Sequence, residues 1–200
     1  MSIFIVRHGE TVQNAARVIQ VPATPLSASG REQAERLARR MTGCGLVRIV
    51  SSDLARAAET AQCVSARTGV AIEFDPAWRE RDFGDLRGTP YSALTLDPFA
   101  LDYRPPNGEG WAEFHARVDA AWQRVARAAA QMQGNLLVVT HGLVCRALVE
   151  RHLALAPGAS CPARWENAAL TEIDAKPPWT VRLLHCTAHL VDAAPTDAVV

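Results

Sequence analysis

Leu136-Leu137-Val138-Val139-Thr140-His141-Gly142 is an aliphatic run that ends in a histidine and a glycine, and Ile3-Phe4-Ile5-Val6-Arg7-His8-Gly9 has the same pattern. A continuous aliphatic and β-branched run is typical of a parallel strand that is buried on both faces. The carboxyl ends of such strands meet at one edge of the sheet, where α/β proteins bind ligands. We therefore expect His8 and His141 to lie together, although they are far apart in the chain.

Strands and helices alternate along the chain. Short hydrophobic runs predict strands at 2–7, 47–51, 70–74, 136–140, 169–173 and 181–185. Helical spacing and capping signals predict helices at about 30–42, 53–68, 111–132 and 143–154. Ser27 or Ser29 can cap the first helix, Ser29 with capping-box spacing to Glu32, and Gly69 is expected to end the second in a left-handed conformation. Such alternation predicts an α/β three-layer sandwich, with a mostly parallel central sheet flanked by helices.

The chain has the length of one large domain, which we expect to span 1–192 and to be followed by a flexible tail at 193–200. Prolines interrupt residues 76–110, and this irregular stretch is predicted to be a functional insertion over the edge of the sheet.

Composition excludes several classes of function. Lys and Arg together number 21, as do Asp and Glu, so no overall charge recruits nucleic acid or an anionic membrane. No apolar run approaches the roughly 18 residues of a membrane span, and no signal peptide is apparent. The five cysteines lack a CxxC spacing, which favours reduced thiols and a cytoplasmic location. We expect a small-molecule substrate and no cofactor or metal; the oligomeric state is left open.

The residues that follow the strands predict phosphoryl transfer. Arg7 and Arg56, the second in the first turn of a helix, can bind phosphate through planar guanidinium groups and a helix N-terminus. Neutral His8 can attack phosphorus and form a phosphohistidine, while His141 donates hydrogen bonds to phosphoryl oxygens. A carboxyl group must protonate the leaving alkoxide and later activate water. Glu80 is the first candidate for that acid, and Glu109 is the second.

Each of these residues alone is weak evidence, because most arginines and histidines after strands are structural. Their joint occurrence after three separate predicted strands carries the argument. We interpret His115, His152 and His185 as structural or surface residues, and His189 is only a weak candidate for the site.

The chain resembles the histidine phosphatase superfamily, the phosphoglycerate-mutase-like proteins, over nearly all of residues 2–190. The matching stretches are Arg7-His8-Gly9-Glu10-Thr11 with Asn14, Pro25-Leu26-Ser27, Ser51-Ser52-Asp53-Leu54 with Arg56, Glu80-Arg81-Asp82-Phe83-Gly84, Gly108-Glu109 with Arg117, and Val139-Thr140-His141-Gly142 with Arg146. The resemblance implies that His8 is the phosphorylated nucleophile and Glu80 the proton donor. It implies a substrate-binding set of Arg7, Thr11, Asn14, Arg56, His141 and Gly142.

Some positions qualify the resemblance. Gly9 after His8 points away from the acid-phosphatase and phytase branch. Val21, Ala23 and Gly110 replace residues common in the family, and we expect these changes to touch the rim of the pocket and to affect the substrate rather than the chemistry.

The superfamily contains mutases and phosphatases. Mutases that resemble this chain carry a long insertion that keeps water from the phosphohistidine, whereas here only Thr89 to Gly108 separate Gly88 from Glu109. We therefore favour a phosphomonoester hydrolase over a mutase.

Two alternative functions, each from a different functional class, stay open. The first is a metal-dependent hydrolase that uses His8, His141 and Glu80, although two neighbouring arginines would repel a divalent metal. The second is an inactive phosphate-binding module, which would usually have lost one of the catalytic groups.

Segments 84–110 and 18–26 are predicted to select the substrate. They contain or border the aromatic residues Tyr91, Phe99 and Tyr103 and the basic residues Arg81, Arg87 and Arg104. The alternative is that these side chains only pack and solvate the segment over the site.

Overall fold

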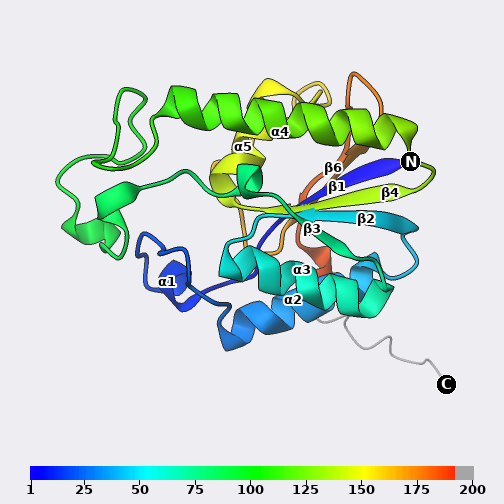
Figure 1. The fold of residues 1–200 in the computed structure, drawn as a ribbon, viewed down its shortest axis with the longest axis horizontal. Coiled ribbons are helices and arrows are strands. Elements are labelled where there is room, and N and C mark those ends of the chain that lie inside the picture. The colour runs from blue at the N-terminus through cyan, green and yellow to red at the C-terminus, as the bar shows by residue number, and fades with distance from the viewer. Residues whose placement is uncertain (192–200) are drawn as a thin grey trace.

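A six-stranded sheet lies at the centre of the computed structural model, which describes residues 1–191 (Figure 1). Its strand order is β3-β2-β4-β1-β5-β6. The strands are β1 (Ser2–Arg7), β2 (Leu46–Ser51), β3 (Ile72–Phe74), β4 (Asn135–Thr140), β5 (Leu170–Asp174) and β6 (Val181–Cys186). Strands β1 to β4 are parallel to one another, β5 pairs antiparallel with β1, and β6 pairs antiparallel with β5. This mostly parallel sheet confirms the predicted α/β class. The predicted tail at 193–200 lies outside the described residues.

Helices cover both faces of the sheet. They are α1 (Val12–Ala15), α2 (Ala28–Met41), α3 (Ala55–Thr68), α4 (Trp111–Gln131) and α5 (Gly142–Arg151). Figure 1 shows α4 and α5 on one face and α2 and α3 on the other, which are the three predicted layers. Within residues 1–191, no helix combines the length and apolarity that crossing a membrane would require.

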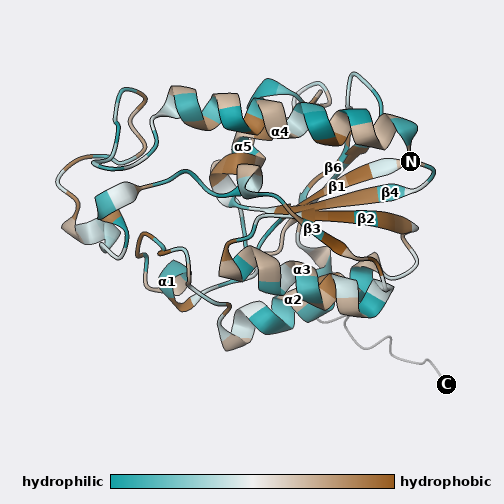
Figure 2. Ribbon diagram, viewed as in Figure 1, coloured by the Kyte–Doolittle hydropathy of each residue, from teal (hydrophilic) through white to brown (hydrophobic). Residues whose placement is uncertain are grey.

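The pleat of β1 explains why its run is apolar at every position. Ile3 and Ile5 pack in the core beneath α4 and α5, and Phe4 and Val6 pack in the core against α2 and α3. Side chains of a strand alternate between faces, so a strand covered on both sides needs no polar face. Figure 2 shows the central strands as the most hydrophobic part of the molecule.

The helix ends follow the predicted signals with one correction. Ser27 caps α2, because its hydroxyl accepts a hydrogen bond of 2.9 Å from the Gly30 amide. The predicted Ser29–Glu32 capping box is wrong, since α2 begins at Ala28 and Ser29 lies inside its first turn. Gly69 ends α3 with a φ of 73°, as expected from its left-handed cap.

The loop after β1 packs closely against α2. A Cβ atom on Gly30 would lie 1.9 Å from the carbonyl oxygen of Glu10, a distance that no side chain tolerates. Glycine at this position therefore lets α2 support the loop that begins at His8.

Residues 76–110 extend beyond the carboxyl ends of the strands, at the left of Figure 1. They contain short 3-10 helices at Pro76–Trp78, Gly84–Leu86 and Tyr91–Ala93. The Gly88 amide donates to the carbonyl of Ile19 at 2.7 Å, and Val18 forms a bridge with Pro90. The two segments predicted to select the substrate are thus joined to each other.

Candidate active site

The carboxyl ends of three neighbouring strands bring the predicted residues together. Arg7 of β1 lies opposite Thr140 of β4, and the His8 amide donates to the Thr140 carbonyl at 2.9 Å. The ring centroids of His8 and His141 are 5.1 Å apart. Strand β2 ends beside β4, and the Ser52 amide donates to the Val139 carbonyl at 3.0 Å. The predicted meeting of the two histidines follows from this parallel register.

His8 is held in its neutral form. Its Nδ1 lies 2.7 Å from the carbonyl oxygen of Gly9, and because a carbonyl only accepts, Nδ1 carries the proton. The lone pair is therefore on Nε2, which receives a hydrogen bond of 3.2 Å from Nε of Arg56. Burial, and then the charges of Arg56 and Arg7, hold the pKa of His8 well below its usual value. The imidazole is therefore neutral near neutral pH, and the lone pair on Nε2 is suited to attack phosphorus if a bound phosphoryl group takes over the hydrogen bond from Arg56.

Arg56 and Arg7 bring positive charge into a desolvated place. Arg56 is only 3% exposed, and burial lowers its pKa to about 10, which leaves it charged near neutral pH. Burial also lowers the pKa of Arg7, while the charge of Glu80 opposes that change. One guanidinium nitrogen of Arg7 donates to the Trp165 carbonyl, whereas Nε of Arg7 has no hydrogen-bond partner among the described residues. A phosphoryl dianion would satisfy such donors and offset the cost of burying these charges.

His141 completes this arrangement. Its Nε2 lies 2.8 Å from the Ser52 hydroxyl, whereas its Nδ1 has no partner among the described residues. Burial, followed by the charge of Arg56, holds the pKa of His141 well below its usual value. When the Ser52 hydroxyl donates to Nε2, Nδ1 carries the proton and can donate a hydrogen bond to a phosphoryl oxygen. Gly142 begins α5, and its amide is one of the first four that lack a partner within the helix.

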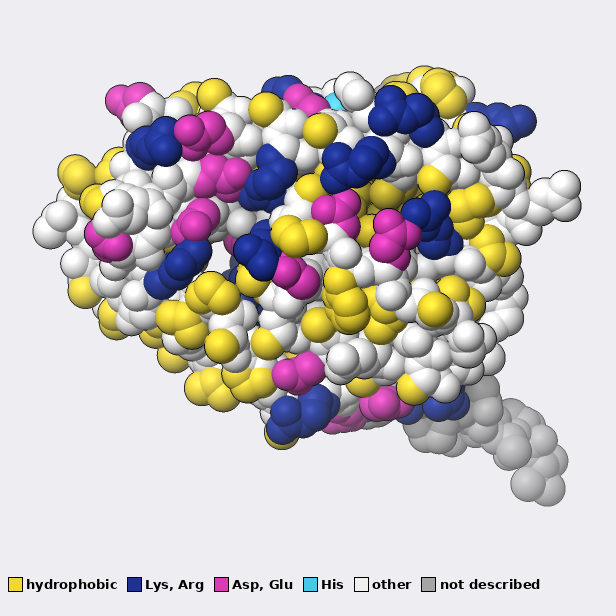
Figure 3. Space-filling model, viewed as in Figure 1, with side chains coloured by type: hydrophobic (Ala, Val, Ile, Leu, Met, Phe, Trp, Pro, Cys, Tyr) yellow, Lys and Arg dark blue, Asp and Glu magenta, His cyan; other side chains and the backbone are white. Residues whose placement is uncertain are grey.

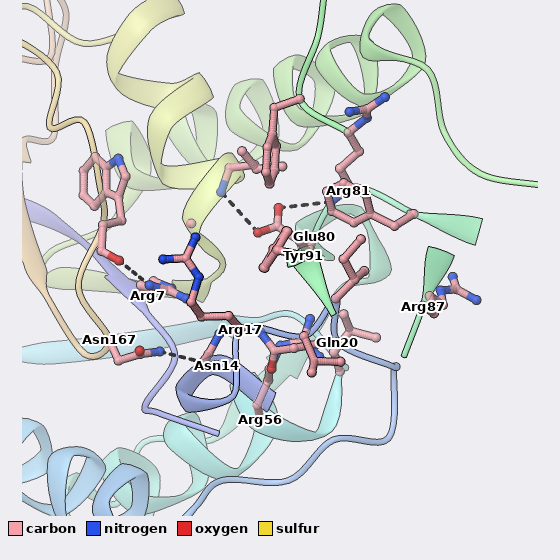
Figure 4. Close-up of a pocket in the computed structure, with 18 of the residues that line it drawn as sticks. Arg7, Asn14, Arg17, Gln20, Arg56, Glu80, Arg81, Arg87, Tyr91 and Asn167 are labelled. Carbon is pink, nitrogen blue, oxygen red and sulfur yellow. Dashed lines mark hydrogen bonds between the residues drawn. The ribbon is translucent and has the colours of Figure 1, made fainter. Parts of the chain in front are cut away.

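Glu80 has the environment of a proton donor. Its two carboxyl oxygens accept hydrogen bonds from the amides of Arg81 at 3.0 Å and Leu143 at 3.2 Å (Figure 4). Burial raises the pKa of Glu80, and these hydrogen bonds and the charges of Arg56 and Arg7 only partly oppose it. The raised pKa favours a carboxyl group that still carries its proton when the substrate arrives.

Glu109, the second candidate, is occupied elsewhere. Arg117 donates to both of its oxygens, at 2.9 and 2.6 Å, and Glu109 does not line the cavity beside Glu80. Arg117 also donates to the carbonyls of Ala77 and Arg79. The pair therefore holds the residues before Glu80 in place, and the geometry favours Glu80 as the acid.

A cavity of about 650 Å³ opens above these residues. Arg7, Arg56, Glu80 and Gly142 line it, while His8 and His141, at 1% and 0% exposure, lie below its floor. Figure 3 shows basic and acidic side chains gathered around a hollow in the left half of this face. The cavity is large enough for a small phosphorylated metabolite.

Thr11 and Asn14 have different positions. Asn14 lines the cavity as predicted, and its Oδ1 accepts from Nδ2 of Asn167 at 3.2 Å. Thr11 is fully buried and absent from the cavity lining. Its hydroxyl caps α1 and donates to the side chain of Gln20 at 2.8 Å. The structure therefore gives Thr11 a positioning role, since Gln20 itself reaches the cavity.

The basic residues of segment 84–110 and its border are already paired. Arg81 is buried and donates to the carbonyls of Glu109, Pro98 and Tyr103 at 3.0, 2.9 and 2.6 Å. Arg87 lines the cavity and pairs there with Asp82 at 2.5 Å. Arg104 lies outside the cavity lining and pairs with Glu113 at 2.9 Å.

Two of the three aromatic residues of the segment line the cavity. Tyr91 and Phe99 line the cavity, with ring centroids 5.9 Å apart, whereas Tyr103 does not. Among the basic residues of the hypothesis, Arg104 is not supported by the geometry, whereas Arg87 lines the cavity but is already paired with Asp82.

The replaced family positions lie largely outside the cavity. None of Val21, Ala23 and Gly110 belongs to its lining, so the expectation that they touch the rim is not supported for Ala23 and Gly110. Only Val21 contacts the site, because its carbonyl accepts from Arg56 at 3.3 Å.

The remaining histidines also lie outside the cavity lining. His115 packs on Trp111, His152 bonds Asp119 at 2.7 Å, His185 contacts Glu166, and His189 lies 3.1 Å from the Ala168 carbonyl. Their contacts agree with the structural interpretation. Within residues 1–191, no three His, Cys, Asp or Glu side chains are grouped so as to hold a metal ion.

Sequence reasoning missed residues of the loop between α5 and β5. Asn167 donates to the carbonyl of His8 at 3.1 Å as well as to Asn14, and Arg164 and Trp165 line the cavity beside it. This loop carries no strand ending or glycine motif, so nothing in its local pattern marked it. Arginine is also so common in the chain that Arg164 did not stand out.

A neutral buried histidine, two arginines and a carboxyl group at the carboxyl edge of a parallel sheet define a phosphoryl-transfer site. A profile of the histidine phosphatase superfamily (branch 1) matches residues 3–185, and the chain belongs to that family.

Individual relatives have mutase or phosphatase names. The chain is 33% identical to a probable phosphoglycerate mutase, GpmB, of Yersinia enterocolitica, over 95% of each chain. A solved structure of a putative α-ribazole-5′-phosphate phosphatase of Escherichia coli is 27% identical, with a TM-score of 0.78, over 93% of this chain and 96% of that one. A mycobacterial glucosyl-3-phosphoglycerate phosphatase in complex with VO3 is 26% identical, with a TM-score of 0.74, over 86% and 90%.

Proposed function

We propose that the protein is a metal-independent phosphomonoester hydrolase that acts on a small phosphorylated metabolite through a phosphohistidine. The observation that carries this proposal is the unprotonated Nε2 of His8, which accepts a hydrogen bond from Arg56 next to a cavity that Arg7, Arg56 and Glu80 line.

The chemistry takes two steps. In the first, Nε2 of His8 forms a bond to phosphorus while the bond to the leaving oxygen breaks and Glu80 gives that oxygen its proton. In the second, Glu80, now a carboxylate, accepts a proton from water as the water oxygen attacks phosphorus and the bond to Nε2 breaks. Arg7, Arg56 and His141 bind the phosphoryl oxygens, whose charge is spread over the transition state.

Hydrolysis is favoured over transfer to a second substrate by the short segment over the site. The segment from Thr89 to Gly108 contains Leu96 and Leu101, which are 66% and 86% exposed instead of packed over the phosphoryl site. Water should therefore reach the phosphohistidine. The mutase names of the curated relatives favour the alternative, a phosphoglycerate-mutase-type transferase.

Replacing His8 by alanine tests the proposal. The variant should lose turnover and acid-labile phosphorylation together, and turnover by the unaltered protein should persist in excess EDTA. Vanadate should inhibit the unaltered protein because it adopts the five-coordinate geometry of the transition state. Substantial turnover by His8→Ala would exclude the nucleophile, and loss of activity in EDTA that added metal restores would favour the metal-dependent reading.

Trapping the phosphorylated chain separates hydrolysis from transfer. We expect its label to appear as inorganic phosphate at the same rate with and without added alcohol acceptors. A label that stays on the chain until an acceptor is added would identify a transferase, and a chain that never becomes labelled would point to an inactive binding module.

We also propose a reducing compartment such as the cytoplasm. All five cysteines are free thiols in the structure, which supports this location.

A further inference from the structure

Arginines dominate the charge of the cavity, and most of them are engaged. Eight arginines line it, against Glu80 and Asp82 as acids. Arg7 and Arg56 lie at the phosphoryl site, and Arg81 is held by three carbonyl groups. The others that have partners are paired with carboxylates: Arg79 with Asp53, Arg87 with Asp82 and Arg146 with Glu150.

Arg17 and Arg164 are the exceptions. Among residues 1–191, neither side chain has a hydrogen-bond or ion-pair partner, and both are exposed. Unpaired arginines on an ordinary convex surface need no explanation in a chain so rich in arginine. These two line the cavity that contains the phosphoryl site, so their charges act on whatever occupies it.

Contacts place both residues next to the site. Trp165, which follows Arg164, accepts a hydrogen bond from Arg7, and the charge of Arg164 adds to the burial that lowers the pKa of Arg7. The carbonyl of Arg17 accepts from the Tyr91 amide at 2.9 Å. Burial raises the pKa of the Tyr91 hydroxyl, and the nearby charges of Arg7 and Arg17 oppose that change. Figure 4 shows Arg17 among the residues that surround the cavity.

The backbone of Arg17 is a second, independent observation. Its φ is +54°, in the left-handed region that glycine and asparagine adopt more readily. The Arg17 amide donates to the Asn14 carbonyl at 3.1 Å, so the turn is held on both sides of the residue. Arginine is disfavoured in this backbone conformation, so its charged side chain explains its presence at position 17 better than its backbone preference does.

We propose that Arg17 and Arg164 form a second anion subsite, so that the preferred substrates are phosphomonoesters whose leaving group carries its own carboxylate or phosphate. The phosphoryl group would occupy Arg7 and Arg56, and the apolar part of the leaving group would pass along Tyr91 and Phe99. The inference rests on the proposed function, and it replaces Arg87 and Arg104 as the arginines that select the substrate.

Three esters with similar alkyl leaving groups test this subsite: propyl phosphate, 3-(phosphonooxy)propanoate and propane-1,3-diyl bisphosphate. The measured quantity is the ratio of kcat/KM for each anionic ester to that for propyl phosphate. The variants are Arg17→Asn, which suits the left-handed backbone, and Arg164→Met. Arg146→Met is the matched control, because Arg146 lines the same cavity but is already paired with Glu150.

Each of the two variants should lower at least one ratio about tenfold, as expected for the loss of a charge-assisted hydrogen bond. Arg146→Met should keep both ratios within about threefold of the unaltered protein. The ratio that falls shows whether the second anion is a carboxylate or a phosphate. Unchanged ratios in either variant, or an equal fall in the control, would overturn the paired subsite.

A binding measurement separates this inference from the proposed function. Calorimetry in a His8→Ala background measures the affinity for the same three ligands without turnover. If the unaltered protein hydrolyses none of the esters, the proposed function fails. The ratio of the affinity for each anionic ester to that for propyl phosphate still tests the subsite. At least one ratio should fall in Arg17→Asn and in Arg164→Met, and unchanged ratios would refute the subsite.

Discussion

Glu80 and Glu109 show how one residue type can have very different surroundings within a short distance of the same site. Glu80 has only two amide donors and lies in a desolvated cavity, which raises its pKa. Glu109 is held by a guanidinium group at two points. A desolvated carboxyl group without a cationic hydrogen-bond partner can keep a proton for transfer. The Glu109 carboxyl group instead holds Arg117, and with it the residues before Glu80.

Glu80→Gln should therefore slow the hydrolysis of alkyl phosphates by roughly two to four orders of magnitude, because the leaving alkoxide loses its proton donor. Single-turnover phosphorylation by p-nitrophenyl phosphate should suffer much less, since that leaving group needs no proton.

Glu109→Gln is the control. It should act through stability and affect both classes of ester alike. Equal loss on both classes for Glu80→Gln, together with a selective loss for Glu109→Gln, would reverse the assignment of the acid.

At the scale of elements, the site depends on how closely α2 supports the loop after β1. Gly30 lies where a Cβ atom would meet the Glu10 carbonyl oxygen at 1.9 Å, and the Ser27 amide donates to the same carbonyl at 2.9 Å. Loop and helix are thus in direct backbone contact, two residues beyond His8.

Gly30→Ala should destabilise the protein by about 3 kcal/mol, because one element must move away from the other. It should also lower activity, since His8 moves with the loop. Urea unfolding followed by tryptophan fluorescence measures the first effect.

Gly110→Ser serves as the comparison. A Cβ atom there has no neighbour nearer than 3.8 Å, and serine suits the N-cap position, which Gly110 occupies just before α4. Equal stability of the two variants would show that loop and helix can separate at little cost.

For the whole molecule, the burial of two neutral histidines links stability to pH. The folded pKa values of His8 and His141 lie well below 6.5, mainly because both rings are buried. Below pH 6.5 the unfolded chain therefore binds more protons than the folded one. The stabilisation from these groups is fully present above that pH and is lost as pH falls through it.

The free energy of unfolding should accordingly decrease between pH 7 and pH 5.5, by at most about 1.4 kcal/mol per pH unit for each histidine below pH 6.5. Urea titrations at several pH values measure this slope, and His141→Gln should reduce it. His152→Gln, at a partly exposed position outside the cavity lining, is the control. The same slope in the unaltered protein and in His141→Gln would contradict the account.

Local patterns were sufficient to predict the fold and the centre of the site. The hydrophobic runs of β1 and β4 specify strands buried on both faces, and parallel pairing then carries His8 and His141 to the same edge of the sheet. Arg56 follows from the same rule through β2 and the start of α3. These predictions succeeded because they depend on residue spacing within each strand or helix and on the geometry that all parallel sheets share.

Contacts between distant segments decided the rest. Nothing in the local sequence distinguishes Arg87 from Arg17. In the folded chain, however, Arg87 pairs with Asp82, whereas the Arg17 side chain has no partner among the described residues. Asn167 reaches the His8 carbonyl from a loop with no motif, and Thr11 turns away from the cavity to hold Gln20. A charge or hydrogen bond depends on distances of a few ångströms between side chains, and only tertiary packing determines those distances.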